Sequence, residues 1–160
     1  MAECELFRLR QALGSFATGV TVVTTSTNGK PVGVTISSFS SVSLTPPMVL
    51  WTLRKSSSSM SIFAQEAHFA VHILSQDQLT LCERFSTSHT ERFSGLNYSI
   101  SQYGTPRFPD CAGRFECRTV HQYDGGDHII FVGEVMSFDT NSEVRPLLFH
   151  NGKLKTLMAS

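Results

Sequence analysis

Hydroxyl side chains concentrate in residues 35–41, where the sequence reads TISSFSS. Apolar residues alternate before this segment, at Val32 and Val34, and the pattern resumes after it at Val42 and Leu44. We therefore expect the hydroxyls to lie where one strand ends and another begins. Such a break exposes backbone N–H groups beside side-chain donors, which together can bind a polar ring edge or a phosphate. A β-bulge or an exposed crossover has the same composition and is the more common explanation.

A second hydroxyl cluster stands beside two cations. Arg54 and Lys55 are followed by four serines, Ser56 to Ser59, and then by apolar residues at helical spacing. Serine is favoured at helix N-caps, and a helix N-terminus with neighbouring cations can bind an anion. A capped helix behind a solvated loop is the simpler explanation. Because only one predicted strand, residues 48–53, separates the two clusters, they can share one ligand, with a ring at the first and a phosphate at the second.

A glycine turn leads into a histidine, His128, in the sequence GGDH at 125–128. At the mouth of a strand this imidazole can donate to a ligand, although a lone histidine there is more often satisfied by the backbone. The other histidines and the four cysteines have no metal-ligand spacing, so we expect no metal site. Nucleophile-elbow, phosphate-loop and dinucleotide fingerprints are absent, and the acidic residues are scattered. We expect no acid–base residue, and any reactivity would come from a bound cofactor.

The elements that must position these residues are mainly strands. β-Branched residues fill 19–27, and Asn28 with Gly29 is a strong hairpin signal. Ser75 and Gln78 form a capping-box pattern. Further strands are expected at 32–36, 42–44, 48–53, 69–73, 115–119 and 128–138, and helices at 3–16, from 60 and from 79. The sequence predicts a single α+β domain over residues 1–160, mainly β, with an antiparallel barrel and a few short helices outside it.

Composition and charge restrict the partners. The 160 residues include 13 basic and 13 acidic side chains, so the formal net charge is zero, which argues against nucleic acid as a ligand. The 21 serines and 15 threonines give a neutral surface that protects poorly against self-association, and this favours an oligomer. The sequence starts without a secretory signal and has no run of about 18 apolar residues. We expect a cytoplasmic protein with reduced cysteines and no membrane contact.

Six motifs stand in order along nearly the whole chain: ALGSFATGVTVVTT at 12–25, GVTISSFSSVSLTPP at 33–47, ERFSG at 91–95, GTP at 104–106, FEC at 115–117 and GGDHIIFVGEV at 125–135. In this ordered set the chain resembles the short-chain flavin reductases, the FMN-binding split-barrel family that supplies reduced flavin to two-component monooxygenases. The resemblance implies an antiparallel split β-barrel, a homodimer, and transfer of hydride from NADH or NADPH to FAD or FMN.

The resemblance also assigns roles to residues. By it, the edge of the isoalloxazine ring is held by Thr35, Ile36, Ser37 and Ser38, the ribityl–phosphate side by Ser41, and the flavin phosphate by Arg54, Lys55, Ser56 and Ser59. His128 matches the residue that meets the nicotinamide nucleotide. Two alternatives remain open at this point: a flavin-binding module without catalysis, and an oxidase that keeps FMN tightly bound. The partner monooxygenase implied by the family is not identified by the sequence.

Overall fold

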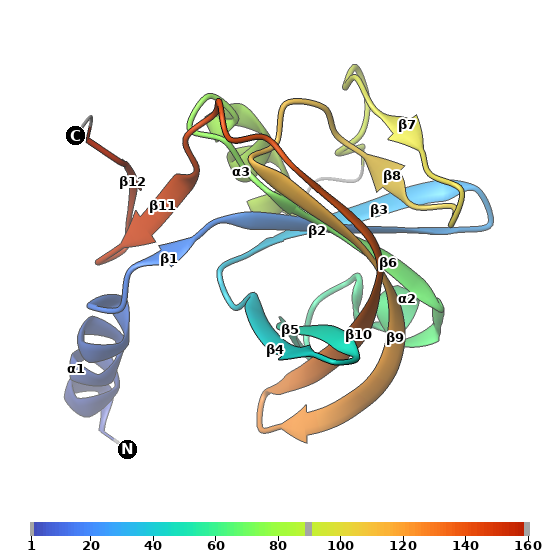
Figure 1. The fold of residues 1–160 in the computed structure, drawn as a ribbon. Coiled ribbons are helices and arrows are strands. Elements are labelled where there is room, and N and C mark those ends of the chain that lie inside the picture. Colours follow the sequence, from blue (N-terminus) through green and yellow to red (C-terminus); the bar gives the residue numbers. More distant parts are fainter. Residues whose placement is uncertain (1, 89–90, 159–160) are drawn as a thin grey trace.

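The chain is organised around one curved antiparallel sheet of seven strands. The computed structural model describes residues 2–88 and 91–158, and the strand order in this sheet is β3-β2-β6-β9-β10-β5-β4 (Figure 1). The strands are β2 (Thr21–Thr27), β3 (Lys30–Ile36), β4 (Ser40–Leu44), β5 (Pro47–Arg54), β6 (His68–Ile73), β9 (Gly113–Gly125) and β10 (His128–Thr140). The expected mainly-β antiparallel architecture is confirmed.

The remaining elements are short and peripheral. Two small sheets contain β1 (Thr18–Gly19), β11 (Leu147–His150) and β12 (Lys153–Thr156), and separately β7 (Ser99–Ile100) and β8 (Pro106–Arg107). The helices are α1 (Glu3–Gly14), α2 (Met60–Gln65) and α3 (Leu79–Ser86). In Figure 1, α1 stands away from the large sheet, next to β1. Within the described residues, no helix has both the length and the apolar character needed to cross a membrane.

Strand β2 is buried on both faces, which explains its nearly continuous β-branched sequence. Successive side chains of a strand point to opposite sides. Val22 therefore packs in one cluster, with Phe85 and Phe108, and Val23 packs in a second cluster, with Trp51. The two clusters hold the sheet from its two sides.

The two long strands β9 and β10 curl the sheet. Their pairing shifts register between Val132 and Gly133 and again between Val135 and Ser137. Such irregularities bend a strand and increase its twist. At Gly133 the absence of a side chain leaves room for Phe69, whose ring lies against the glycine. The curl brings β5 round toward the first strands of the sheet.

The barrel stays open along one seam. The edge strands β3 and β4 are not paired with each other in the described part of the chain, and residues 37–39 cross between them. Ser38 bridges this seam, since its Oγ accepts the Thr52 N–H at 2.9 Å and lies 3.3 Å from the Thr52 carbonyl oxygen, to which it donates. One hydroxyl therefore ties the crossover to β5.

Several local expectations can be compared with the structure. The hairpin turn is confirmed, because Asn28 and Gly29 have φ values of 50° and 73°. The capping-box prediction is confirmed only in part. Gln78 accepts the Ser75 N–H at 3.0 Å, but α3 begins at Leu79, so the bond closes a turn before the helix. The first helix ends at Gly14 rather than at residue 16.

All four cysteines are free thiols. Cys82, Cys111 and Cys117 are buried, and Cys4 is exposed. Burial raises the pKa of Cys82, that of Cys111 to about 11 and that of Cys117 to about 12. The three buried thiols therefore stay protonated at neutral pH.

Candidate functional site

A cavity of about 920 Å³ opens between strand β3 and the serine cluster. Residues 30–34 of β3 form one wall, residues 56–59 form a second, and residues 85–88 and 91–94 form the third. The apolar surface comes from Val32, Phe85 and Phe93, and the charged side chains at the lining include Lys30 and Arg92. The volume is in the range of small-molecule and cofactor sites.

The serine cluster lines this cavity, but no serine side chain caps α2. Ser56 and Ser59 both face the cavity. Ser59 precedes α2 with a helical backbone, φ −92° and ψ −5°, and its side chain makes no capping bond. Instead, the Ser59 N–H is satisfied by the Ser57 hydroxyl at 3.2 Å. The N-cap prediction is therefore wrong, because side-chain capping needs an extended residue at that position.

The two cations before the serines do not line the cavity. Both are exposed, and Lys55 forms an ion pair with Asp124, with 2.6 Å between Nζ and Oδ2. Its backbone N–H also donates to the Asp127 carbonyl at 2.9 Å. The hydrogen bond from Lys55 lowers the pKa of Asp124. Lys55 thus ties the loop after β5 to the β9–β10 turn, while Arg54 lies opposite His128 in the sheet.

The cations that do line the cavity, Lys30 and Arg92, were not among the residues singled out from the sequence. Lys30 follows the hairpin turn, and the Arg92 guanidinium donates to the Gly33 carbonyl at 2.9 Å. Arg92 belongs to the ERFSG motif at 91–95, which was the one feature of the sequence that could have pointed to it. No local pattern shows that this motif folds back onto β3, because the contact joins residues 59 positions apart.

The first hydroxyl segment continues from the wall of the cavity but does not line it. Thr35 donates its hydroxyl to the Cys82 carbonyl at 2.8 Å, and Ser38 is bonded to Thr52. Ile36 packs against the Trp51 cluster. Ser37 and Ser41 are exposed. The structure therefore leaves Ser37 and Ser41 as the solvent-facing hydroxyls among these predicted residues, while Thr35 and Ser38 hold the seam in place.

His128 begins β10, and its imidazole is oriented by the preceding residue. Nδ1 lies 2.7 Å from Oδ1 of Asp127. Because a carboxylate accepts, the proton of the neutral ring sits on Nδ1 and Nε2 is left for a ligand. This hydrogen bond lowers the pKa of Asp127. The side chain of His128 is 34% exposed, so a ligand can reach it.

The structure groups the predicted residues into three neighbouring sets. Ser56 and Ser59 face the cavity, Arg54 and Lys55 stand with His128 at the end of the β5–β10 pair, and the residues from Thr35 to Ser41 follow the seam. No group of three or more His, Cys, Asp or Glu side chains within the described ranges is placed to hold a metal ion.

Comparison with known proteins shows which family the chain belongs to. A family model described as a flavin reductase like domain matches residues 13–158. The chain belongs to the flavin reductase-like family. FMN reductase (NADH) SmoA from Agrobacterium fabrum is 48% identical to it over 143 residues, which cover 89% of this chain and 81% of that protein.

Two further relatives agree with the family and the fold. The flavin-dependent monooxygenase reductase subunit HsaB of Rhodococcus jostii is 37% identical over 146 residues, covering 91% of this chain and 75% of that protein. The NADH:FAD oxidoreductase SgcE6 of Streptomyces globisporus, solved in complex with NAD and FAD fragments, superposes with a TM-score of 0.93 at 31% identity and covers 99% of this chain and 96% of that chain. The expected flavin reductase fold is thereby confirmed.

Proposed function

We propose that this flavin reductase-like protein transfers hydride from NADH or NADPH to FMN or FAD and releases the reduced flavin to a partner monooxygenase. The observation that carries the proposal is the cavity itself, whose lining combines hydroxyls, two cations and apolar side chains. Names of its relatives, an FMN reductase (NADH) and a monooxygenase reductase subunit, support the same activity.

The residues present fit a flavin nucleotide. Ser56 and Ser59 offer neutral donors, and Lys30 and Arg92 offer positive charge to a phosphate at the same lining. Val32, Phe85 and Phe93 give an apolar surface for a ring system. The exposed hydroxyls of Ser37 and Ser41 stand further along the same seam and can bind polar ring or ribityl atoms. A flavin bound there supplies the hydride acceptor.

The protein's own part in the reaction is to bind and orient. Hydride transfer needs aligned reactants in close contact and no obligatory proton donor, so positioning groups suffice. We assign His128 to the nicotinamide nucleotide, since its Nε2 is open and Asp127 fixes the ring. Arg54, on the paired strand, adds a positive charge beside it. Hydroxyl donors bind with moderate strength, which suits a flavin that must leave.

An anaerobic stopped-flow series tests the proposal. The purified protein is mixed with riboflavin, FMN or FAD and then with NADH or NADPH, and the flavin absorbance is followed. Bleaching at a saturable rate is expected. Flavin binding without bleaching by either nicotinamide would instead identify a non-catalytic binding module. Flavin that stays on the protein through gel filtration would favour an oxidase with tightly bound FMN.

His128→Ala is expected to lower kcat/KM for the nicotinamide about tenfold, because one positioned hydrogen bond is worth about 1.4 kcal/mol. The Kd for FMN should change by less than about twofold. Steady-state kinetics and a fluorescence titration of FMN measure the two quantities. His121→Ala, an exposed histidine in the same hairpin, is the matched control. An equal loss of FMN affinity would remove His128 from this role.

Ser56→Asp is expected to weaken FMN binding about tenfold, because a carboxylate at the exposed lining position repels the phosphate. Riboflavin, which has no phosphate, should bind within about twofold of its affinity for the unchanged protein. Fluorescence titrations with both flavins make the comparison. Ser61→Asp places the same charge on α2 away from the lining and should leave both affinities unchanged. Equal weakening for both flavins would place the phosphate elsewhere.

We further propose that the protein is a homodimer closed by α1. Within this helix no residue is buried, although Leu6, Phe7, Leu9 and Leu13 are apolar, and Phe16 just beyond it is 78% exposed. A contiguous apolar face of this kind marks an interaction surface. Sedimentation should give roughly twice the 17.7 kDa chain mass. Leu13→Glu should shift the species toward the monomer, whereas Arg8→Glu, on the opposite side of the helix from Leu6 and Leu13, should not. A monomeric parent protein would contradict the proposal.

A further inference from the structure

A second cavity, of about 360 Å³, lies at the β2–β3 hairpin, apart from the cavity proposed to bind flavin. Its walls are residues 25–29 of the hairpin, residues 66–68 between α2 and β6, and residues 100–105 of the β7–β8 connection. None of the described residues that line it also lines the first cavity. It is therefore a separate site, with its own chemistry.

The charge of this second cavity is opposite to that of the first. Its described lining contains one carboxylate, Glu66, and no lysine or arginine, whereas Lys30 and Arg92 line the first and outnumber its one carboxylate, Glu91. Glu66 directly follows α2, is only partly exposed, and forms no side-chain hydrogen bond or ion pair within the described residues. A half-buried carboxylate without a partner attracts a cation.

An aromatic pair forms the wall next to this carboxylate. The rings of His68 and Tyr103 are stacked, with centroids 5.6 Å apart and an interplanar angle of 24°. Both residues line the cavity. The face of a tyrosine ring attracts a desolvated cation, and aromatic walls beside a negative charge are the usual environment for alkylammonium groups.

The Tyr103 ring is positioned by a turn that hydrogen bonds stabilise. Its backbone N–H donates to Ser101 Oγ at 3.1 Å, and Gly104 takes the positive φ of 80° that the turn requires. Behind the turn, the buried Thr105 hydroxyl donates to the carboxylate of Glu116.

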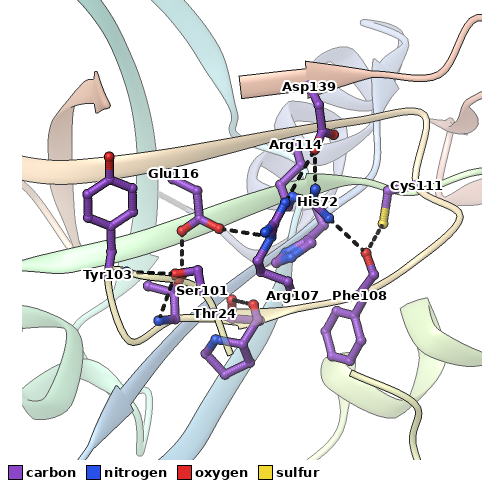
Figure 2. Close-up of polar contacts among 12 residues, drawn as sticks. Thr24, His72, Ser101, Tyr103, Arg107, Phe108, Cys111, Arg114, Glu116 and Asp139 are labelled. Atoms are coloured by element: carbon purple, nitrogen blue, oxygen red, sulfur yellow. Dashed lines mark hydrogen bonds and ion pairs between the residues drawn. The ribbon is translucent and has the colours of Figure 1, made fainter. Parts of the chain in front are cut away.

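The contacts behind this turn extend into the sheet. Glu116 is 3% exposed, and its Oε1 lies 3.4 Å from Nε of Arg107, which Figure 2 shows beside the turn. The charge of Glu116 is thus countered from the side away from the cavity. Glu66 remains the carboxylate that the cavity presents, against a wall that is preorganised before any ligand arrives.

We propose that this second cavity binds a small organic ammonium ion, with the Glu66 carboxylate as its counter-ion and the Tyr103 ring as its aromatic face. The Ser26 hydroxyl, which also lines the cavity, is available to a polar substituent of the ligand. The volume accommodates an ammonium group with several carbon atoms. This site is independent of hydride transfer and goes beyond the function proposed above.

Tetramethylammonium chloride and tert-butanol, which has a similar shape and no charge, are the probes. In a two-dimensional amide NMR titration of the full chain at about pH 8, tetramethylammonium should shift the Glu66, His68 and Tyr103 signals saturably in the millimolar range. tert-Butanol and sodium chloride should not produce these shifts. A response to tert-butanol equal to that of the cation, or no saturable shift with the cation, would overturn the proposal.

Two variants and a control complete the test. Glu66→Gln removes the charge and no contact, so it should fold normally and lose at least about tenfold in affinity for tetramethylammonium. Tyr103→Leu should lose about threefold. Glu143→Gln removes an exposed carboxylate outside both cavities and should bind like the parent. If Glu66→Gln binds tetramethylammonium as tightly as the parent protein does, Glu66 is not the counter-ion and the proposal is refuted.

Discussion

Gly133→Val is expected to destabilise the folded protein by about 3 kcal/mol, which is roughly a hundredfold in the unfolding equilibrium. A Cβ at this position would lie 2.4 Å from Cζ of Phe69 and 3.0 Å from Cβ of Cys117. Phe69 is 2% exposed, and its ring lies against Trp51 with centroids 5.6 Å apart. The ring has no free space to move into, because protein interiors are close-packed.

Urea denaturation followed by tryptophan fluorescence measures the effect of Gly133→Val, since Trp51 lies in the affected cluster. Gly19→Val is the matched control: no atom lies within 4 Å of its would-be Cβ, and the residue is exposed in a strand. Phe69→Leu combined with Gly133→Ala should recover part of the loss that Gly133→Ala causes, because the smaller side chain vacates the contact. An unchanged midpoint in Gly133→Val would show that the sheet can shift to admit the side chain.

Acidification from pH 7 to pH 4 is expected to cost the protein about 3 kcal/mol of stability through His72 alone. This residue is completely buried. Its Nδ1 lies 3.0 Å from the Val22 carbonyl, which can only accept, so the neutral ring keeps its proton there, while Nε2 has no hydrogen-bond partner among the described residues. Burial lowers the pKa of His72 from 6.5 to about 4, against the raising effect of the Val22 bond and with the help of Arg114 and Arg107.

The direction of this stability change follows from the number of protons that the folded and unfolded chains bind. Between about pH 6.5 and pH 4, the unfolded chain takes up a proton at His72 that the folded chain does not bind. Stability is therefore complete above pH 6.5 and falls by about 1.4 kcal/mol per pH unit as the pH drops through this window. Carboxylates also titrate near the lower end of this pH window. The contribution of His72 is therefore measured as the difference in pH dependence between the parent protein and a His72 variant.

His72→Gln should flatten the dependence of the unfolding free energy on pH between 6.5 and 4.5, because an amide can donate to Val22 without titrating. Urea denaturation at several pH values measures the slope for each protein. His121→Gln, which replaces an exposed histidine, should keep the parent slope. If His72→Gln shows the parent slope as well, another group is responsible for the acid sensitivity.

Much of the fold could be predicted from the sequence, because strand burial and turn geometry depend on residues that are close together in the chain. The β-branched run of β2 reflects burial on both faces, and the Asn28–Gly29 turn needs two left-handed residues. The prediction of a side-chain cap from the serine cluster was wrong, since the helical backbone conformation of Ser59 cannot be inferred from composition.

The candidate site was predictable only where one segment supplies it. Ser56 and Ser59 reach the cavity because they follow β5 directly. Lys30 and Arg92 escaped notice because the loop that carries Arg92 returns to β3 from far along the chain. The hydroxyls of Thr35 and Ser38 resemble ligand donors in the sequence, but their partners, on α3 and β5, are visible only in the fold.

The burial of three thiols has a consequence for how the protein is oxidised. Reduced flavin that meets oxygen before it meets a partner yields hydrogen peroxide, so a flavin reductase works close to an oxidant of its own making. Peroxide attacks thiolates, and Cys82, Cys111 and Cys117 are kept protonated and out of reach. Of the four cysteines, Cys4 alone is exposed. Thiol oxidation should therefore begin at Cys4 on α1 and spare the cysteines of the packed interior.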